Sequence, residues 1–263
     1  MCCRIVFCDK EFANLTQLTS EDANRYSDTI SIPEIGLEGQ EKLRSSSALV
    51  VGLGGLGSIV ALYLAAAGVG RLGLMDGDSV ALSNLQRQIL HRTSSLGAKK
   101  TSSAYLELSD LNPSVKLETH QAFITKENAG QFIDGYDVIV GCTDTYSSYL
   151  TINEECVRLQ KPYVFGSVSR FEGQISVFDA FSGPCYKCAF PNVTEEFDKI
   201  YPFHGIFSPV PGVIGSIQAS ECLKLLIGIR SLLVSKLFIY DSLEMSVNVI
   251  QISKQPDCPV CGH

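Results

Sequence analysis

Residues 48–70, with the sequence ALVVGLGGLGSIVALYLAAAGVG, decide how this chain folds. The apolar residues 48–51 predict a buried strand, a glycine-rich turn follows, and residues 58–67 predict a helix that Gly68 ends. No charge occurs in residues 45–70, which is long enough for a membrane-spanning helix. Four glycines near the middle would penalise a continuous helix, so a buried strand, a turn and a buried helix are the better interpretation.

Strand-like and helix-like segments alternate outward from this stretch. Strands are predicted at 71–75, 115–120, 137–140 and 163–165, and helices at 98–111 and 147–159. This order predicts an α/β fold with a Rossmann-like core, in which helices cover both faces of a largely parallel sheet. Residues 1–44 are expected to form an N-terminal helical segment with a weak helical pattern near 19–26, and residues 45–263 a single domain.

The pattern changes after Glu172. Residues 174–179 alternate as an antiparallel strand does, residues 213–227 predict a helix, and residues 236–240 and 246–252 predict closing strands, which makes the sheet mixed. An irregular stretch lies between the first of these strands and the helix, and long loops of this kind tend to be functional. It contains Pro184, Pro191, Pro202, Pro209 and Pro211.

Composition narrows the class of protein. The chain has 263 residues, 45% of them hydrophobic, and its 21 basic and 28 acidic side chains give a net charge of -7. A chain this apolar is not expected to be disordered, and its acidic balance argues against binding to nucleic acid or an anionic membrane surface. The N-terminus shows no secretory signal, so we expect a cytoplasmic protein whose ten cysteines are reduced, buried or bound to metal.

The glycine-rich turn is a candidate phosphate-binding site. Gly52, Gly54, Gly55 and Gly57 allow a tight turn and a close approach of phosphate to the backbone N–H groups at the start of a helix. Asp76 ends the next strand, where a carboxylate accepts hydrogen bonds from ribose hydroxyls. Together these features predict an adenine nucleotide, but they do not separate NAD or FAD from ATP.

Two cations downstream favour a triphosphate. Arg87 lies in the segment Asn84-Leu-Gln-Arg-Gln88, and Lys100 lies at the start of the next predicted helix. Arginine and lysine beside a nucleotide turn suit a triphosphate better than a nicotinamide cofactor, unless both are solvated surface residues. Asp144 follows another parallel strand, where its carboxylate would hold Mg²⁺, cap the following helix, or do both.

Two Cys-x-x-Cys pairs predict a metal site. Cys185 and Cys188 form one pair, and Cys258 and Cys261 form the other. Two such pairs supply the four thiolates of a closed, structural Zn²⁺ site, with redox pairs or free thiols as the alternative. The remaining cysteines are scattered, and Cys156 and Cys222 are expected in the core. The others are Cys2, Cys3, Cys8 and Cys142.

In combination, these motifs resemble the MoeB/ThiF/HesA family, the bacterial relatives of ubiquitin-activating enzymes. The resemblance runs from about Arg25 to Cys261. The motifs that carry it are GLGGLG at 52–57, Asp76-x-Asp78, NLQRQ at 84–88, Gly97-x-x-Lys100, LNP at 111–113, CTD at 142–144, EGQ at 172–174, PCYKC at 184–188, GVIG at 212–215 and CPVC at 258–261. It implies a homodimeric enzyme that binds Mg-ATP and adenylates the C-terminal Gly-Gly carboxylate of a small ubiquitin-like sulfur-carrier protein, with a four-cysteine zinc site.

The resemblance also implies a role for each matching residue. Gly55 would contact phosphate and Asp76 the ribose, with Asp78 beside it. Asp144 would serve the metal and the α-phosphate, and the uncharged residues 205–217 would help to receive the tail of the carrier. The residues expected around the triphosphate are Asn84, Arg87, Gln88 and Lys100.

Several positions depart from the family pattern. Asp28 stands where an arginine usually reaches the nucleotide site of the partner subunit, and Thr145 and Tyr149 stand where asparagine and arginine usually follow Asp144. Tyr201 aligns with a cysteine that some members use in covalent chemistry, and His204 lies nearby. We therefore expect adenylation without a covalent step through this loop.

Three other functions remain open at this point. An NAD-dependent dehydrogenase would share the glycine turn and Asp76 but would leave Lys100 and the cysteine pairs unexplained. A nucleotide-binding interaction protein with weakened catalysis is suggested by Asp28, Thr145 and Tyr149. A relative that adenylates the C-terminus of a short peptide, as in microcin biosynthesis, is a variant of the main hypothesis.

Overall fold

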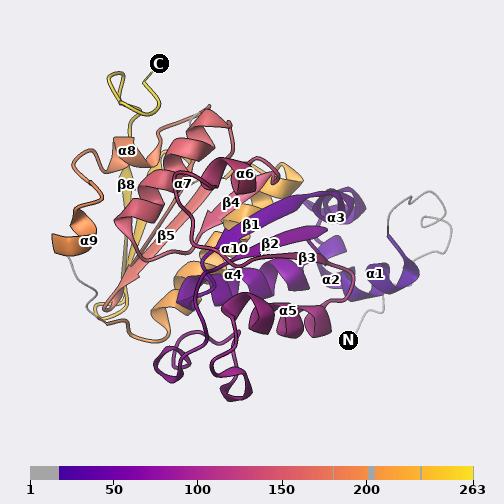
Figure 1. The fold of residues 1–263 in the computed structure, drawn as a ribbon. Coiled ribbons are helices and arrows are strands. Elements are labelled where there is room, and N and C mark those ends of the chain that lie inside the picture. The colour runs from indigo at the N-terminus through magenta and orange to yellow at the C-terminus, as the bar shows by residue number, and fades with distance from the viewer. Residues whose placement is uncertain (1–17, 180, 201–204, 232, 263) are drawn as a thin grey trace.

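The structure, a computed structural model, describes residues 18–179, 181–200, 205–231 and 233–262. Its core is one eight-stranded mixed sheet in the order β3-β2-β1-β4-β5-β6-β7-β8. Figure 1 shows how the sheet and the helices are arranged. The strands are β1 (Ser47–Val51), β2 (Arg71–Met75), β3 (Lys116–His120), β4 (Val138–Gly141), β5 (Tyr163–Ser169), β6 (Glu172–Phe178), β7 (Lys236–Asp241) and β8 (Ser246–Gln251). The first five strands pair in parallel, and pairing from β5 to β8 is antiparallel. The predicted α/β architecture with a mixed sheet is confirmed.

Helices cover both faces of this sheet (Figure 1). Helices α3, α4, α5 and α10 contribute to the hydrophobic cluster on one face, and α6, α7 and α8 to the cluster on the other. The helices are α1 (Ser20–Arg25), α2 (Ser27–Ile30), α3 (Gly36–Ser45), α4 (Gly55–Ala66), α5 (Lys100–Leu111), α6 (Ala129–Ile133), α7 (Tyr146–Arg158), α8 (Tyr186–Ala189), α9 (Phe197–Ile200) and α10 (Val210–Ile227), with short 3₁₀ turns at Leu82–Asn84 and Thr93–Ser95.

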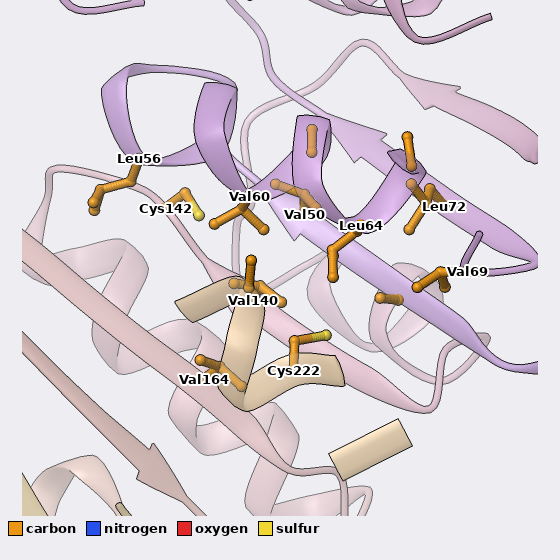
Figure 2. Packing of buried hydrophobic residues seen from close by; sticks show 14 of the residues in the cluster. Val50, Leu56, Val60, Leu64, Val69, Leu72, Val140, Cys142, Val164 and Cys222 are labelled. Atoms are coloured by element: carbon orange, nitrogen blue, oxygen red, sulfur yellow. The ribbon is translucent and has the colours of Figure 1, made fainter. Parts of the chain in front are cut away.

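Strand β1 is apolar from Ala48 to Val51 because both of its faces are buried. Successive side chains of a strand point to opposite faces, so Val50 packs toward α4 while Leu49 and Val51 pack toward α6 and α7. Figure 2 shows Val50 and Val140 facing Val60 of α4 and Cys222 of α10. Each fully buried aliphatic side chain of this kind contributes about 1.5–3 kcal/mol. The expected burial of Cys156 and Cys222 is confirmed.

Some elements differ from those that the sequence predicted. The irregular stretch after β6 contains the short helices α8 and α9, and α10 begins at Val210 with a proline in its first turn. Proline fits there because the first N–H groups of a helix have no partner within the helix. Helix α6 was not predicted, since it is only five residues long and no apolar period can develop over so short a length.

Among the described helices, only α10 is long and apolar enough to cross a membrane, judged by length and composition alone. Half of its residues are buried inside the protein, where it packs against α4 and against β5 and β6. Its apolar composition is therefore accounted for by the core. The uncharged stretch 45–70 forms β1, the glycine turn and α4, as the sequence predicted.

Candidate nucleotide site and adjoining cleft

The glycine turn joins β1 to α4, and its glycines serve two purposes. Gly52 has φ +94°, and a Cβ there would lie 2.6 Å from the carbonyl oxygen of Cys142. A Cβ on Gly57 would lie 1.9 Å from the carbonyl oxygen of Gly52. Both positions therefore require glycine for the packing of the turn itself. Gly54 and Gly55 line a cleft, where the absence of a side chain leaves the backbone accessible to a ligand.

This cleft, called here the glycine-turn cleft, lies where the carboxyl ends of β1, β2 and β4 meet. The strand order reverses between β1 and β4, which is where ligands bind in open α/β sheets. The cleft gathers most of the predicted site residues, but Gly57 and Asn84 do not line it. Those that do are Gly52, Gly54, Gly55, Asp76, Asp78, Arg87, Gln88, Lys100 and Asp144.

Asp76 links the glycine turn to the residues that follow β2. Its Oδ2 accepts a hydrogen bond of 2.8 Å from the backbone N–H of Leu53, and its Oδ1 accepts one of 2.8 Å from that of Asp78. The ammonium of Lys100 lies 3.0 Å from Asp78 and 3.6 Å from Asp76, and only 6% of its side chain is exposed. The two carboxylates thus offset the cost of burying this cation and hold it at the cleft.

Two buried side-chain atoms of the cleft have no hydrogen-bond partner among the described residues. They are Oε1 of Gln88 and Oγ1 of Thr143. Buried polar atoms are normally paired, so unpaired ones in a cleft point to a polar ligand. The N-terminus of α4 and the Arg87 side chain present positive charge to the cleft, and the Lys100 ammonium is held there between Asp76 and Asp78. The cleft therefore fits an anionic nucleotide.

Asp144 does not cap α7, so that alternative from the sequence was wrong. The N-cap is Thr145, whose hydroxyl oxygen accepts a hydrogen bond from the N–H of Ser148. The Asp144 side chain is exposed, and it forms no salt bridge with any residue that the structure describes. The hydroxyl of Tyr149 donates to the carbonyl oxygen of Thr143 at 3.0 Å. Thr145 and Tyr149, which depart from the family pattern, thus have structural roles beside Asp144.

A second cleft adjoins the first and was not predicted. We call it the aromatic cleft, because Tyr146, Tyr149, Phe165, Tyr186 and Phe197 are among its walls. It meets the glycine-turn cleft at residues that line both, among them Thr143, Asp144, Thr145, Val168 and Ile206. Its other walls are Ser167, Ser169, Gln174, Phe190, Val193 and Asp198. The two clefts therefore adjoin along these shared residues, and Asp144 lies where they meet.

The four predicted metal ligands lie together. The sulfur atoms of Cys185, Cys188, Cys258 and Cys261 are all within 4.8 Å of one another, and all four side chains are buried. Neighbouring sulfurs are 3.4 to 4.0 Å apart. Tetrahedral zinc with bonds of about 2.3 Å would place its sulfurs about 3.8 Å apart, so the cluster fits this ion.

Several residues that the sequence singled out lie outside the two clefts or outside the described residues. Asp28 is exposed on α2 and does not line the glycine-turn cleft of its own chain. Tyr201, His204, Cys2, Cys3 and Cys8 lie outside the described residues. The wall at Ala122, Phe123 and Ile124 was missed, although it directly follows β3, and the rule that ligands bind at the carboxyl ends of strands could have indicated it.

His91, also missed, ties the glycine turn to α5. Its Nε2 donates to the carbonyl oxygen of Leu53 at 3.0 Å, and its Nδ1 lies 3.0 Å from the hydroxyl of Ser103. Burial lowers the pKa of His91, and the nearby Lys100 ammonium lowers it further, against the opposing effects of the Leu53 carbonyl, Asp76 and Glu107. The neutral imidazole is therefore the form that the folded protein favours.

This pKa shift predicts a pH-dependent stability. Because the unfolded chain binds the His91 proton more readily, the free energy of unfolding should fall as the pH drops below about 6.5. Urea unfolding at pH 7.5 and pH 5.5 should show a smaller difference for His91→Gln than for the unmodified protein. His120, whose pKa burial also lowers, acts in the same direction, so His120→Gln should reduce the difference as well. An unchanged difference in His91→Gln would contradict the assignment.

Comparison with known proteins places the chain among adenylating enzymes by sequence. The model of the ThiF family matches residues 26–260. Adenylyltransferase and sulfurtransferase MOCS3 of Anopheles gambiae is 40% identical over 256 residues, which are 95% of this chain and 57% of that protein. Sulfur carrier protein adenylyltransferase of Thermus thermophilus is 40% identical over 252 residues, 93% of this chain and 92% of that protein. The chain thus spans little more than half the length of the MOCS3 relatives.

Solved structures share the fold at lower identity. Escherichia coli MccB with MccA-N7isoASN has a TM-score of 0.83 at 23% identity, and the match covers 96% of this chain and 76% of that one. MccB with ATP has a TM-score of 0.82 at 24% identity, and the match covers 91% of this chain and 75% of that one. At this identity the likeness supports the fold and not a particular substrate.

Proposed function

This chain belongs to the ThiF family, and from that premise we propose that it adenylates the C-terminal carboxylate of a small ubiquitin-like sulfur-carrier protein. ATP would supply the adenylyl group, and pyrophosphate would be released. The observation that carries the proposal is that two adjoining clefts share Asp144 and its neighbours as walls: one fits a nucleotide, and the other lies beside it. The names of relatives that are 40% identical support the same reaction.

The chemistry requires no nucleophile from the protein. A carboxylate oxygen of the carrier forms a bond to the α-phosphorus of ATP, the bond between the α-phosphorus and the bridging oxygen breaks, and pyrophosphate leaves with that electron pair. Arg87 and Lys100 would balance the charge that develops on the leaving group. The N–H groups at Gly54 and Gly55 would hold phosphate oxygens, and Asp76 would bind the ribose. Asp78 would keep Lys100 in place.

Asp144 is the residue we propose for Mg²⁺. Asp76 and Asp78 each contact the Lys100 ammonium, whereas Asp144 is exposed at the junction of the clefts. A carboxylate oxygen is a preferred ligand of this ion, which keeps its remaining positions for water and phosphate. When bound, the ion would neutralise phosphate charge. Oε1 of Gln88 and Oγ1 of Thr143, which have no partner among the described residues, are available to the bound nucleotide.

The aromatic cleft is the proposed path of the carrier tail. Two glycines have no side chains, so an extended Gly-Gly end fits a passage between aromatic walls and can reach the α-phosphate at Asp144. Of the uncharged segment 205–217, Ile206 lines both clefts in the described structure. Asp28 cannot supply the cation that a partner subunit gives in the family pattern, so Arg87 and Lys100 would carry this role within the chain.

The proposal includes a structural zinc ion at the four cysteines, a homodimer and a cytoplasmic location. None of the described cysteines forms a disulfide, which is typical of a reducing compartment. Leu82, Ile89 and Leu96 are exposed apolar side chains on the segment between β2 and α5, which a second subunit would cover. Light scattering in solution would give the subunit number directly.

ATP–pyrophosphate exchange tests the function. We expect the purified protein to exchange labelled pyrophosphate into ATP only when a carrier that ends in Gly-Gly is present, and a panel of such carriers would identify the partner. A carrier without its last glycine is the matched control, since it retains the folded surface and loses the reacting carboxylate position.

Other outcomes would favour other functions. Exchange with short peptides in place of carriers would favour peptide adenylation, and substrate-dependent change in nicotinamide absorbance would favour a dehydrogenase. ATP binding without exchange for any carrier or peptide would contradict the proposal and favour a nucleotide-binding interaction protein.

A further inference from the structure

The N-terminus of α7 is held by a carboxylate from a distant part of the chain. Asp198 of α9 accepts a hydrogen bond of 2.6 Å at Oδ1 from the N–H of Tyr146 and one of 3.1 Å at Oδ2 from the N–H of Ser147. These are the first two residues of α7, whose N–H groups have no partner within the helix. A carboxylate at this end also interacts favourably with the helix dipole.

Further contacts hold α9 against α7. The ring of Phe197 meets that of Tyr146 edge to face, with 5.6 Å between centroids. Glu195, just before α9, also forms an exposed salt bridge of 2.5 Å with Lys126, which lies on the segment between β3 and α6 and not on α7. These contacts fix the Asp198 backbone, so its carboxylate reaches α7 without ordering a long mobile side chain. The contact between α9 and α7 thus combines the packing of Phe197 on Tyr146 with the hydrogen bonds of the Asp198 carboxylate.

The position of this contact connects it to the candidate site. Asp144 and Asp198 both line the aromatic cleft, and the N–H groups that Asp198 binds belong to residues only two and three positions after Asp144. A shift of the turn 144–147 relative to α9 would therefore break the Asp198 contact. The walls of the aromatic cleft that the structure describes include no lysine or arginine, so the α7 N-terminus is what offsets the Asp198 charge there.

We propose that Asp198 is a positioning residue: its bidentate cap on α7 fixes the turn that carries Asp144 and shapes the entrance of the aromatic cleft. This inference rests on the proposed function for its kinetic consequences, whereas the contact itself does not depend on that function. Asp198 acts on the acceptor side of the reaction, because it lines the aromatic cleft and not the glycine-turn cleft.

The experiment compares Asp198→Asn and Asp198→Ala with Glu196→Gln. Asparagine keeps one acceptor oxygen and loses the charge, alanine loses both, and Glu196 is an exposed acid two residues away that does not line the aromatic cleft. Each variant is measured for carrier-dependent ATP–pyrophosphate exchange, ATP affinity by calorimetry, thermal unfolding, and hydrogen exchange at the amides of residues 144–148.

We expect exchange activity to fall about 10- to 100-fold in Asp198→Ala and less in Asp198→Asn, with a raised KM for the carrier and an unchanged ATP affinity. Amides at the start of α7 should exchange faster in the same order, while Glu196→Gln resembles the unmodified protein. A merely structural role would lower thermal stability without this division between carrier and ATP. Full activity and unchanged amide exchange in folded Asp198→Ala would overturn the inference.

The outcomes also separate this inference from the proposed function. If the unmodified protein shows no exchange with any carrier, the proposed function fails, and the amide exchange of residues 144–148 alone decides whether Asp198 positions the turn. If the unmodified protein is active and Asp198→Ala is equally active, the function stands and the positioning role is wrong.

Discussion

Asp144→Ala is expected to lower carrier-dependent ATP–pyrophosphate exchange by about 10²–10³-fold, the usual cost of removing one preorganised charge-stabilising group from a transition state. The fold should survive, because the Asp144 side chain is exposed and Thr145, not Asp144, caps α7. ATP affinity should fall much less than the rate, since the glycine turn, Arg87 and Lys100 remain. Exchange kinetics, calorimetry with ATP and thermal unfolding on one preparation would measure all three effects.

Two further variants sharpen this experiment. Asp144→Asn keeps the shape of the side chain and one neutral oxygen, so a loss close to that of alanine would show that the charge matters more than the contact. Asp134→Ala removes an exposed carboxylate at the end of α6, outside both clefts, and should leave exchange unchanged. Retained activity in Asp144→Ala would remove this residue from the proposed reaction.

The parallel half of the fold could be predicted closely because its signals are local. Strand β2 has the predicted bounds, and β1, β3 and β4 differ from their predictions by one residue at one or both ends. Such strands are short apolar runs between turn residues, and the reversal of strand order then brings Gly52, Asp76 and Asp144 to one edge of the sheet. The glycine-turn cleft therefore follows from the order of its motifs.

The aromatic cleft could not be predicted in the same way. Its walls come from the end of β4, the start of α7, strands β5 and β6, residues between Tyr186 and Asp198, and Ile206, so no single stretch of sequence contains its pattern. Asp198 illustrates the difficulty: nothing in residues 191–200 indicates that a carboxylate there binds the backbone of Tyr146. Contacts between segments this far apart depend on the tertiary fold.

The cysteine cluster was predictable in its members but not in its neighbours. It joins the residues around Cys258 near the C-terminus to α8, whose first residue is Tyr186. The backbone N–H of Tyr186 donates to Oδ1 of Asn153 on α7 at 2.7 Å, and its ring lines the aromatic cleft. A bound metal ion would therefore support one wall of the proposed acceptor path.

Cys258→Ser should remove the zinc ion and destabilise the protein. A structural zinc site of four thiolates contributes up to about 10–16 kcal/mol in small zinc-binding peptides. A loss on the order of 5 kcal/mol here corresponds to a fall in Tm of about 10–20 °C at this chain length. Elemental analysis should find about one zinc per chain in the unmodified protein and almost none in the variant. Cys156→Ala, which changes a buried cysteine outside the cluster, should keep its zinc.

The kinetic consequence of Cys258→Ser follows from where the cluster lies. None of the four cysteines lines the glycine-turn cleft, whereas Tyr186, next to Cys185, lines the aromatic cleft. Below its melting temperature the variant should therefore bind ATP normally and show a raised KM for the carrier. A zinc-free protein of unchanged stability would contradict the structural role of the metal. A variant that loses ATP and carrier affinity equally would instead show that the cluster supports the whole domain, and not the acceptor side alone.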